Sequence, residues 1–273
     1  MVNIINDYKL VDLIGTGSYG EVWKGRHINT KKEVAIKLEK KTSKTYLKYE
    51  TVILRHLHKL NNVVDIKYYG ELSNHNYLIM DLLSISLNEY YNSFIRTNDI
   101  GYKIIKWIGI NMLECIQSVH ENGIIHKDVK PSNFLLNMKH SDIIIIDFGL
   151  SKQYINKNGF HRKNVKRSSI CGTIRYISIN VHDGNEPARR DDLISMIYVL
   201  IYLMKGSLPW QGVPYTNKRE KVKKIHEIKK LVSHYDLCKH LPEKFIEMLD
   251  YCSGLTYEEE PNYDYIGFLM KTI

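Results

Sequence analysis

The chain of 273 residues lacks several features that mark common protein classes. Its four cysteines form no CxxC pair, which argues against a disulfide framework and against a structural zinc site. Its longest apolar runs, at 143–146 and 193–204, are shorter than the ~20 residues needed to cross a bilayer. It shows neither a signal-peptide layout nor an internal repeat. We therefore expect a soluble intracellular protein with no membrane partner.

Acidic residues are too few to balance the basic ones. The chain has 39 lysines and arginines against 30 aspartates and glutamates, which gives a net charge of +9. Such a charge favours an anionic partner, whether nucleic acid, membrane surface or acidic protein, and charge alone does not choose among them. The sequence leaves a cytoplasmic or a nuclear location, or both, open.

The hydrophobic pattern changes near residue 81. Before it, the sequence is mostly strand-like, with short alternating segments such as 8–15, 20–28 and 32–39. One amphipathic helix is predicted at 45–60, with Leu47, Leu57 and Leu60 on one face. From residue 86 onward, helical patterns dominate. We expect a small strand-rich lobe followed by a larger helical lobe.

A glycine-rich motif, GTGSYGEV at 15–22, lies between two predicted strands. Glycines let backbone amides approach phosphate oxygens that a Cβ would keep away. A dinucleotide-binding site uses the same GxGxxG spacing, but it requires a helix after the third glycine. Here a short β-prone segment follows, and then VAIK at 34–37. Lys37 can bind two phosphates of a nucleotide if Glu50, on the predicted helix, fixes it as an ion pair.

The stretch HKDVKPSN at 126–133 places an acid, a lysine and an amide at short intervals. Asp128 can accept or orient a hydroxyl proton, and Lys130 can neutralise charge on a phosphoryl group. Asn133 offers a neutral oxygen ligand for Mg²⁺, and Asp147, after a run of four isoleucines, offers a carboxylate. These residues predict phosphoryl transfer, which depends on positioning and charge neutralisation.

Taken together, these motifs resemble the protein-kinase signature along essentially the whole chain. GTIRYISIN at 172–180, EPARRDDL at 186–193 and GSLPWQG at 206–212 resemble the casein kinase 1 family of serine/threonine kinases. The resemblance implies an α+β bilobal fold in a single catalytic domain, 1–273. Its parts would be a small antiparallel β-sheet N-lobe with one key helix (1–81), a hinge (82–83) and a larger, mainly helical C-lobe (84–273).

The resemblance also assigns roles. Lys37 and Glu50 would form the active ion pair, Asp128 would be the catalytic base with Lys130 beside it, and Asn133 and Asp147 would hold Mg²⁺. Met80 would be the gatekeeper, and Asp81 and Leu83 would supply the hinge backbone. The ATP site would comprise Ile14, Gly15, Thr16, Gly17, Ser18, Gly20, Val22, Ala35, Lys37, Met80, Asp81, Leu83, Leu135 and Ile146.

The family favours acidic or already phosphorylated protein substrates, and Arg175 and Lys221 match the residues that seat the substrate phosphate. A second anion site matches Lys127 and Lys152, but its third cation falls at Ser168, with Arg167 one step earlier. Lys127 also replaces the usual arginine of His-Arg-Asp, and lysine cannot make the bidentate phosphate contact of arginine. This weakens the case for switching by activation-loop phosphorylation, although Ser168 and Ser169 remain available.

Three other functions stay open from the residues. One is the neighbouring vaccinia-related type of kinase, which acts on chromatin proteins. Another is a pseudokinase scaffold, disfavoured because Lys37, Asp128, Asn133 and Asp147 are all present. The last is nucleic-acid binding through the basic surface, which we expect only as a secondary property. We expect a monomer that binds no nucleic acid stably.

Overall fold

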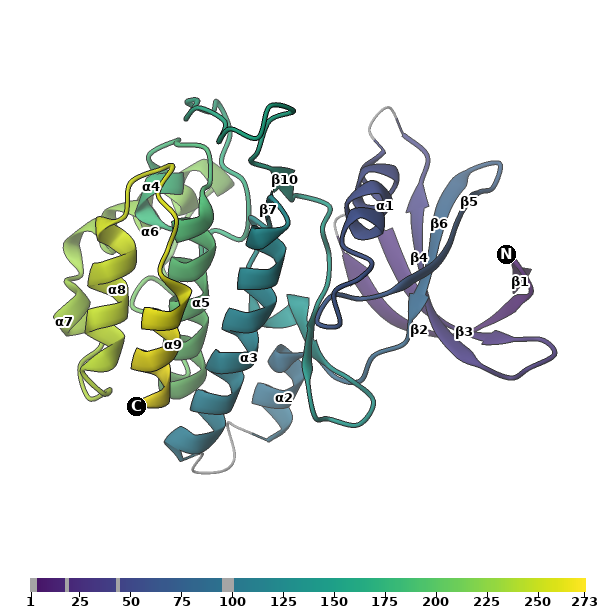
Figure 1. Ribbon diagram of the computed structural model, residues 1–273, viewed down its shortest axis with the longest axis horizontal. Helices are drawn as coiled ribbons and strands as arrows, with labels where there is room; N and C mark the ends of the chain where they lie inside the picture. Colours follow the sequence, from purple (N-terminus) through teal and green to yellow (C-terminus); the bar gives the residue numbers. More distant parts are fainter. Residues whose placement is uncertain (1–3, 18–19, 43–44, 95–100) are drawn as a thin grey trace. The chain divides into compact units, whose positions relative to one another are not determined.

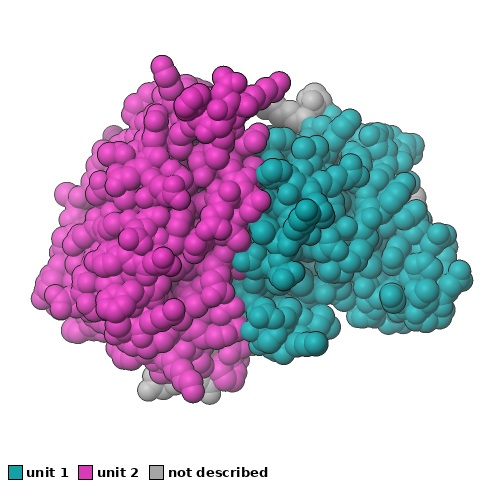
Figure 2. Space-filling model, viewed as in Figure 1, with its two compact units in different colours: residues 1–85, 135–150 teal, residues 86–134, 151–273 magenta. Residues whose placement is uncertain are grey.

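The computed structural model describes residues 4–17, 20–42, 45–94 and 101–273. The chain forms two compact units, coloured separately in Figure 2. The first comprises residues 1–85 and 135–150, and the second comprises residues 86–134 and 151–273. The sequence placed one division at 82–83, but backbone hydrogen bonds join residues 135–150 to the first unit. The Ser84 amide donates to the Leu136 carbonyl, and the Val64 amide donates to the Ile145 carbonyl.

The first unit contains an antiparallel sheet with the strand order β1-β2-β3-β4-β6-β5 (Figure 1). The strands are β1 (Ile4–Ile5), β2 (Tyr8–Gly17), β3 (Gly20–His27), β4 (Glu33–Lys40), β5 (Ile66–Glu71) and β6 (His75–Asp81). Helix α1 (Tyr46–His56) packs against β5 and β6. A separate two-stranded sheet joins β8 (Phe134–Leu136) to β9 (Ile143–Ile145), which lies within the isoleucine run at 143–146.

Alternation along the central strands divides the sheet into two faces. On β4 and β6, Val34, Ile36, Tyr77 and Ile79 form one buried cluster, together with Ile5. The residues between them, such as Ala35 and Lys37, therefore face the other side of the sheet. The hydrophobic cluster fixes the register, and the register decides which polar side chains share the opposite face.

The second unit is mainly helical. Its helices are α2 (Leu87–Ser93), α3 (Tyr102–Glu121), α4 (Ile179–His182), α5 (Arg189–Lys205), α6 (Lys218–Leu231), α7 (His234–Leu237), α8 (Lys244–Gly254) and α9 (Tyr263–Lys271). Shorter elements are β7 (Ile124–Ile125), β10 (Lys152–Gln153) and the 3-10 turn η2 (Pro131–Asn133). Helix α5 is buried almost throughout and packs against α3 and α8 (Figure 1). It is thus the central helix of this unit.

Several local choices explain these helices. Ser86 and Glu89 form a capping box at the start of α2, and Gly206 ends α5 in the left-handed conformation.

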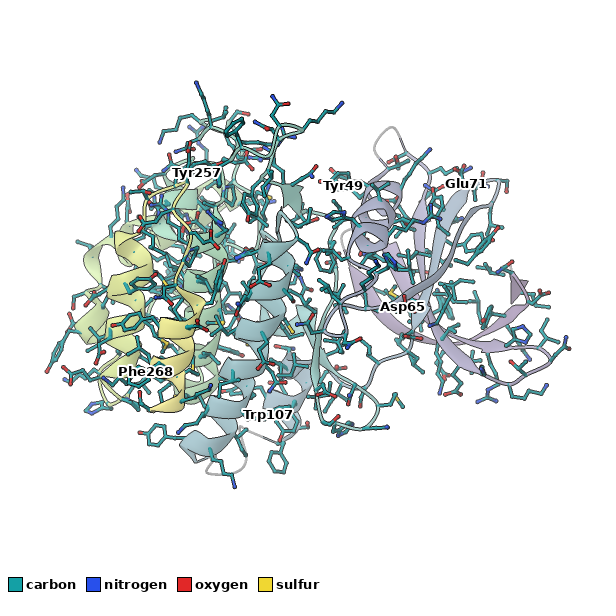
Figure 3. All side chains as sticks on the ribbon, viewed as in Figure 1. Tyr49, Asp65, Glu71, Trp107, Tyr257 and Phe268 are labelled. Atoms are coloured by element: carbon teal, nitrogen blue, oxygen red, sulfur yellow. The ribbon has the colours of Figure 1, made fainter. Side chains whose placement is uncertain are left out.

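Exposed aromatic side chains occur on both units, including Tyr49 on α1 and Phe268 on α9 (Figure 3). None of the helices in the described ranges is both long and apolar enough to cross a membrane.

Candidate active site

The glycine-rich motif forms the end of a β-hairpin. Gly15 and Gly17 lie on β2, opposite Val22 and Gly20 on β3. Gly20 has a φ of +131°, and a Cβ there would overlap the carbonyl oxygen of Leu38, so only glycine is tolerated. Thr16 lies between the two glycines of β2, and Ser18 falls outside the described residues. Because a strand follows the motif, the dinucleotide-binding alternative does not apply.

The sheet register places four of the predicted nucleotide contacts on one face. Val22 is paired with Lys37 across β3 and β4, and Ala35 is paired with Met80 across β4 and β6. Directly paired residues point to the same side, and Ala35 and Lys37 are two residues apart on β4. Val22, Ala35, Lys37 and Met80 therefore share the face opposite the hydrophobic cluster.

Lys37 is held by two carboxylates. Its Nζ lies 2.7 Å from Glu50 Oε2 on α1 and 3.0 Å from Asp147 Oδ1 after β9. Burial lowers the pKa of Lys37, but the charges of Glu50 and Asp147 outweigh this effect and raise it above its usual value. Lys37 thus stays cationic and fixed in place, which is what a phosphate-binding lysine requires.

The remaining predicted nucleotide contacts all belong to the first unit. Ile14, Leu83, Leu135 and Ile146 are apolar side chains that keep some solvent exposure. Asp81, at the end of β6, donates its amide to the Asp65 carbonyl and pairs its carboxylate with Lys67 at 2.8 Å. Partly exposed apolar side chains in the unit that also holds Lys37 suit a flat base attached to phosphates.

In the second unit, three side chains converge on Asp128. Thr173 Oγ1 donates to Asp128 Oδ1 at 2.6 Å, and Lys130 Nζ lies 2.5 Å from Asp128 Oδ2. Asn133 Nδ2 donates to the backbone carbonyl of Asp128 at 2.9 Å. Asp128 is buried, and these donors fix the orientation of its carboxylate. A carboxylate that orients a substrate hydroxyl needs such a fixed position.

Asp192, at the start of α5, binds the backbone of the loop at 126–133 that contains Asp128, the catalytic loop. Its carboxylate accepts the backbone amides of His126 at 2.7 Å and Lys127 at 2.9 Å. His120 Nε2 lies 3.0 Å from the same carboxylate. Burial raises the pKa of Asp192, but the contacts with His120 and His126 outweigh this effect and hold it below its usual range.

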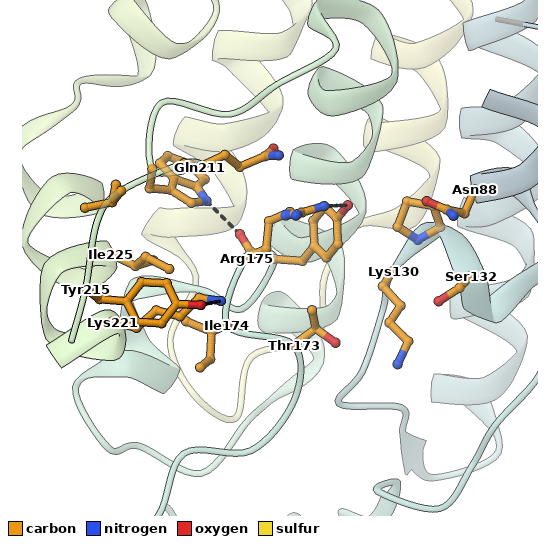
Figure 4. A pocket seen from close by; sticks show the side chains of 15 residues that line it. Asn88, Lys130, Ser132, Thr173, Ile174, Arg175, Gln211, Tyr215, Lys221 and Ile225 are labelled. Atoms are coloured by element: carbon orange, nitrogen blue, oxygen red, sulfur yellow. Dashed lines mark hydrogen bonds between the residues drawn. The ribbon is translucent and has the colours of Figure 1, made fainter. Parts of the chain in front are cut away.

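A pocket of about 540 Å³ lies beside the catalytic loop. Figure 4 shows Lys130, Thr173, Arg175 and Lys221 among the side chains that line it. Lys221 Nζ lies 4.7 Å from the centre of the Tyr215 ring, and the Arg175 guanidinium lies 5.7 Å from the Tyr176 ring. Within the described ranges, no ion pair to a carboxylate includes Arg175 or Lys221. The pocket therefore brings together Arg175 and Lys221, the two cations that the family resemblance assigns to one substrate-phosphate site.

The second predicted anion site already contains a carboxylate of this chain. Glu186 lies 3.1 Å from Lys127 Nζ, 3.2 Å from Lys152 Nζ and 2.8 Å from Arg167 Nη1. Burial raises the pKa of Glu186, but these cations outweigh this effect and hold it below its usual range. Lys127 and Lys152 do come together, with Arg167 as the third cation in place of Ser168. In this arrangement their partner is Glu186.

A family model described as the protein kinase domain matches residues 8–262. The chain belongs to the protein kinase family. It is therefore a phosphotransferase that uses ATP, and the antiparallel sheet followed by helices confirms the predicted α+β kinase fold. Protein kinases use a strand lysine to bind the ATP phosphates and a loop aspartate to orient the substrate hydroxyl, and Lys37 and Asp128 are the residues that the sequence motifs assign to these roles.

Kinases of this family typically work with a divalent cation, and each unit by itself supplies one oxygen donor of the kind that such a cation prefers. The amide nitrogen of Asn133 is used by the Asp128 carbonyl, which leaves the amide oxygen as the group that can face a metal. Asp147 supplies a carboxylate. Carboxylate and amide oxygens are the ligands that hard cations such as Mg²⁺ prefer, and the metal would neutralise charge on the phosphates.

The sequence patterns did not predict a role for Glu186, Trp210 or Lys229. No spacing pointed to a partner for Glu186, Trp210 was one of several aromatic residues, and Lys229 was one of many lysines. Trp210 Nε1 donates to the Arg175 carbonyl at 2.8 Å, and Lys229 is buried. Only the Trp in GSLPWQG carried a local signal, because an indole that is buried needs an acceptor for its N–H.

Proposed function

We propose that this kinase transfers the ATP γ-phosphate, with Mg²⁺, to serine or threonine hydroxyls of acidic or already phosphorylated proteins, as casein kinase 1 enzymes do. The motifs at 172–180 and 206–212 support this subfamily. The observation that carries the proposal is the pocket beside the Asp128 loop, in which Arg175 and Lys221 have no carboxylate partner among the residues that the structure describes.

The geometry supports an anionic residue of the substrate in that pocket. Thr173 contacts Asp128 directly and also lines the pocket, so the pocket lies next to the group that orients the acceptor hydroxyl. Gly212, which has a φ of +70°, adds a backbone without a side chain to the lining. Charge-assisted hydrogen bonds to a phosphate contribute about 1.5–3 kcal/mol each.

The test compares two peptides that differ only in a phosphoserine placed before the acceptor serine. We expect wild type to prefer the primed peptide and Asp128→Asn to be inactive on both. Arg175→Ala/Lys221→Ala should lose the preference, with roughly a 10- to 100-fold drop in kcat/KM for the primed peptide alone. Arg55→Ala/Lys103→Ala, which removes the same charges from exposed positions elsewhere, serves as the control.

Each failure has a distinct meaning. An intact preference in the Arg175/Lys221 variant would remove substrate recognition from this pocket while leaving the kinase in place. A wild-type protein that binds ATP but phosphorylates neither peptide nor casein would favour the pseudokinase scaffold. Activity confined to chromatin proteins would favour the vaccinia-related type.

A further inference from the structure

Helix α6 contains a lysine that is buried away from every acidic side chain in the described part of the chain. Lys229 is 3% exposed and takes part in none of the ion pairs found there. Burial alone lowers its pKa well below the usual value for lysine. Its neighbour Lys230 is 50% exposed and pairs with Asp183 at 2.8 Å. The Lys229 side chain is therefore buried without an acidic partner in the described part of the chain, whereas the adjacent Lys230 is half exposed and forms an ion pair.

The Lys229 amine binds two carbonyls in residues 172–180, which form the end of the activation segment. Nζ donates to the Ile177 carbonyl at 2.6 Å and to the Ile174 carbonyl at 3.0 Å. The same atom lies 4.9 Å from the centre of the Trp210 ring and 5.3 Å from that of Tyr198. Backbone dipoles and aromatic faces thus take the place of a counter-ion.

A buried amine of this kind costs stability, because an apolar side chain of similar length would avoid its desolvation. Such a residue is a candidate for a functional role. The two carbonyls it binds lie on either side of Arg175, whose own carbonyl accepts from Trp210 Nε1 at 2.8 Å (dashed in Figure 4). Lys229 and Trp210 therefore fix the backbone that carries Arg175.

The other end of this backbone is fixed to the catalytic loop. Gly172 has a φ of +91°, and a Cβ there would lie 2.5 Å from the Lys127 carbonyl oxygen. Thr173 donates to Asp128. The segment 172–177 is thus held at one end by catalytic-loop contacts and at the other by Lys229.

We propose that Lys229 is a positioning residue for the protein substrate. Through the carbonyls of Ile174 and Ile177, it orients the segment that presents Thr173 and Arg175 to the pocket. This inference rests on the proposed function, because it takes that pocket as the place where the peptide binds. It predicts that Lys229 governs the KM for peptide and has no effect on ATP binding, since the ATP-binding residues belong to the other unit.

The key variant is Lys229→Met, which keeps the length of the side chain and removes its donors. We expect the peptide KM to rise roughly 10-fold or more, since the two hydrogen bonds that hold the segment are lost, while the dissociation constant for ATP stays unchanged. Lys230→Met is the matched control and should behave as wild type. Trp210→Phe, which loses the hydrogen bond to the Arg175 carbonyl and part of the ring beside Lys229, should also raise the peptide KM and replaces Lys229→Met if that variant does not fold.

Hydrogen exchange separates this inference from the proposed function. The amides of Tyr176 and Ile177 both donate to the Thr173 carbonyl, so they report on the segment without any substrate. We expect faster exchange at both in Lys229→Met. Unchanged exchange together with a peptide KM within twofold of wild type would overturn the role of Lys229. Faster exchange in a protein whose wild type phosphorylates no peptide would instead refute the proposed function.

Discussion

Replacing Asp192 with asparagine should destabilise the second unit more than any surface substitution. Asp192 is 2% exposed, and its two oxygens accept the amides of His126 and Lys127 as well as a contact from His120. Lys127 has a φ of +70°, a left-handed conformation that costs about 1–2 kcal/mol for a residue other than glycine. The carboxylate stabilises this strained backbone.

Asparagine has one acceptor oxygen, so its amide nitrogen must face one of the two backbone donors. One charge-assisted bond, worth about 1.5–3 kcal/mol, is then lost, and the other weakens to a neutral bond of about 0.5–1.5 kcal/mol. The free energy of unfolding should therefore fall by about 2.5–4.5 kcal/mol. For a protein of this size, that shift would lower Tm by roughly 5–18 °C.

Urea unfolding followed by circular dichroism measures this change. Asp250→Asn is the control, because Asp250 is 64% exposed and pairs with His234 at the surface. We expect it to stay within about 1 kcal/mol of wild type. If Asp192→Asn unfolded within that same margin, the hydrogen bonds to the catalytic loop would not be what stabilises its backbone, and the reasoning would be refuted.

Two further predictions concern hydrogen bonds and charge in the same unit. Thr173→Val removes the donor to Asp128 and should lower kcat about 10- to 100-fold in a peptide assay, whereas Thr173→Ser should keep most activity; equal rates would contradict this role. Glu186→Gln leaves the Lys127 cation buried without a carboxylate and should lower the free energy of unfolding at pH 7 by about 3 kcal/mol. The folded-state pKa of Glu186 is lowered, so its contribution to the free energy of unfolding is present at neutral pH and is lost as pH falls below about 4.3. The difference in unfolding free energy between Glu186→Gln and wild type should therefore narrow at pH 4. A difference that stays constant with pH would count against this account.

Local sequence was sufficient for the elements and for much of the site. Alternation in the first 81 residues predicted strands, and the periodicity at 45–60 predicted the helix found at Tyr46–His56. The spacing within 126–133 is so short that Asp128, Lys130 and Asn133 must lie near one another. The ion pair of Lys37 with Glu50 was also predicted, and the contact distances bear it out.

Contacts between distant residues were decided by the tertiary structure. Glu186 meets Lys127 across 59 residues, and Lys229 meets the Ile177 carbonyl across 52. The neighbouring sequence predicts neither contact, because a lysine has the same sequence neighbours whether its side chain faces water, a carboxylate or a backbone carbonyl.

The sequence by itself determined that this chain is a kinase, because the catalytic chemistry uses residues at short, fixed spacings along a strand or a loop. The tertiary structure alone decided which of the many cations are available. It paired Lys127 and Lys152 with Glu186 and buried Lys229 against the carbonyls of Ile174 and Ile177. Within the described ranges, it left Arg175 and Lys221 without a carboxylate partner. The physical reason is that the environment of a charge depends on what packs around it, and packing joins segments that are far apart in the chain.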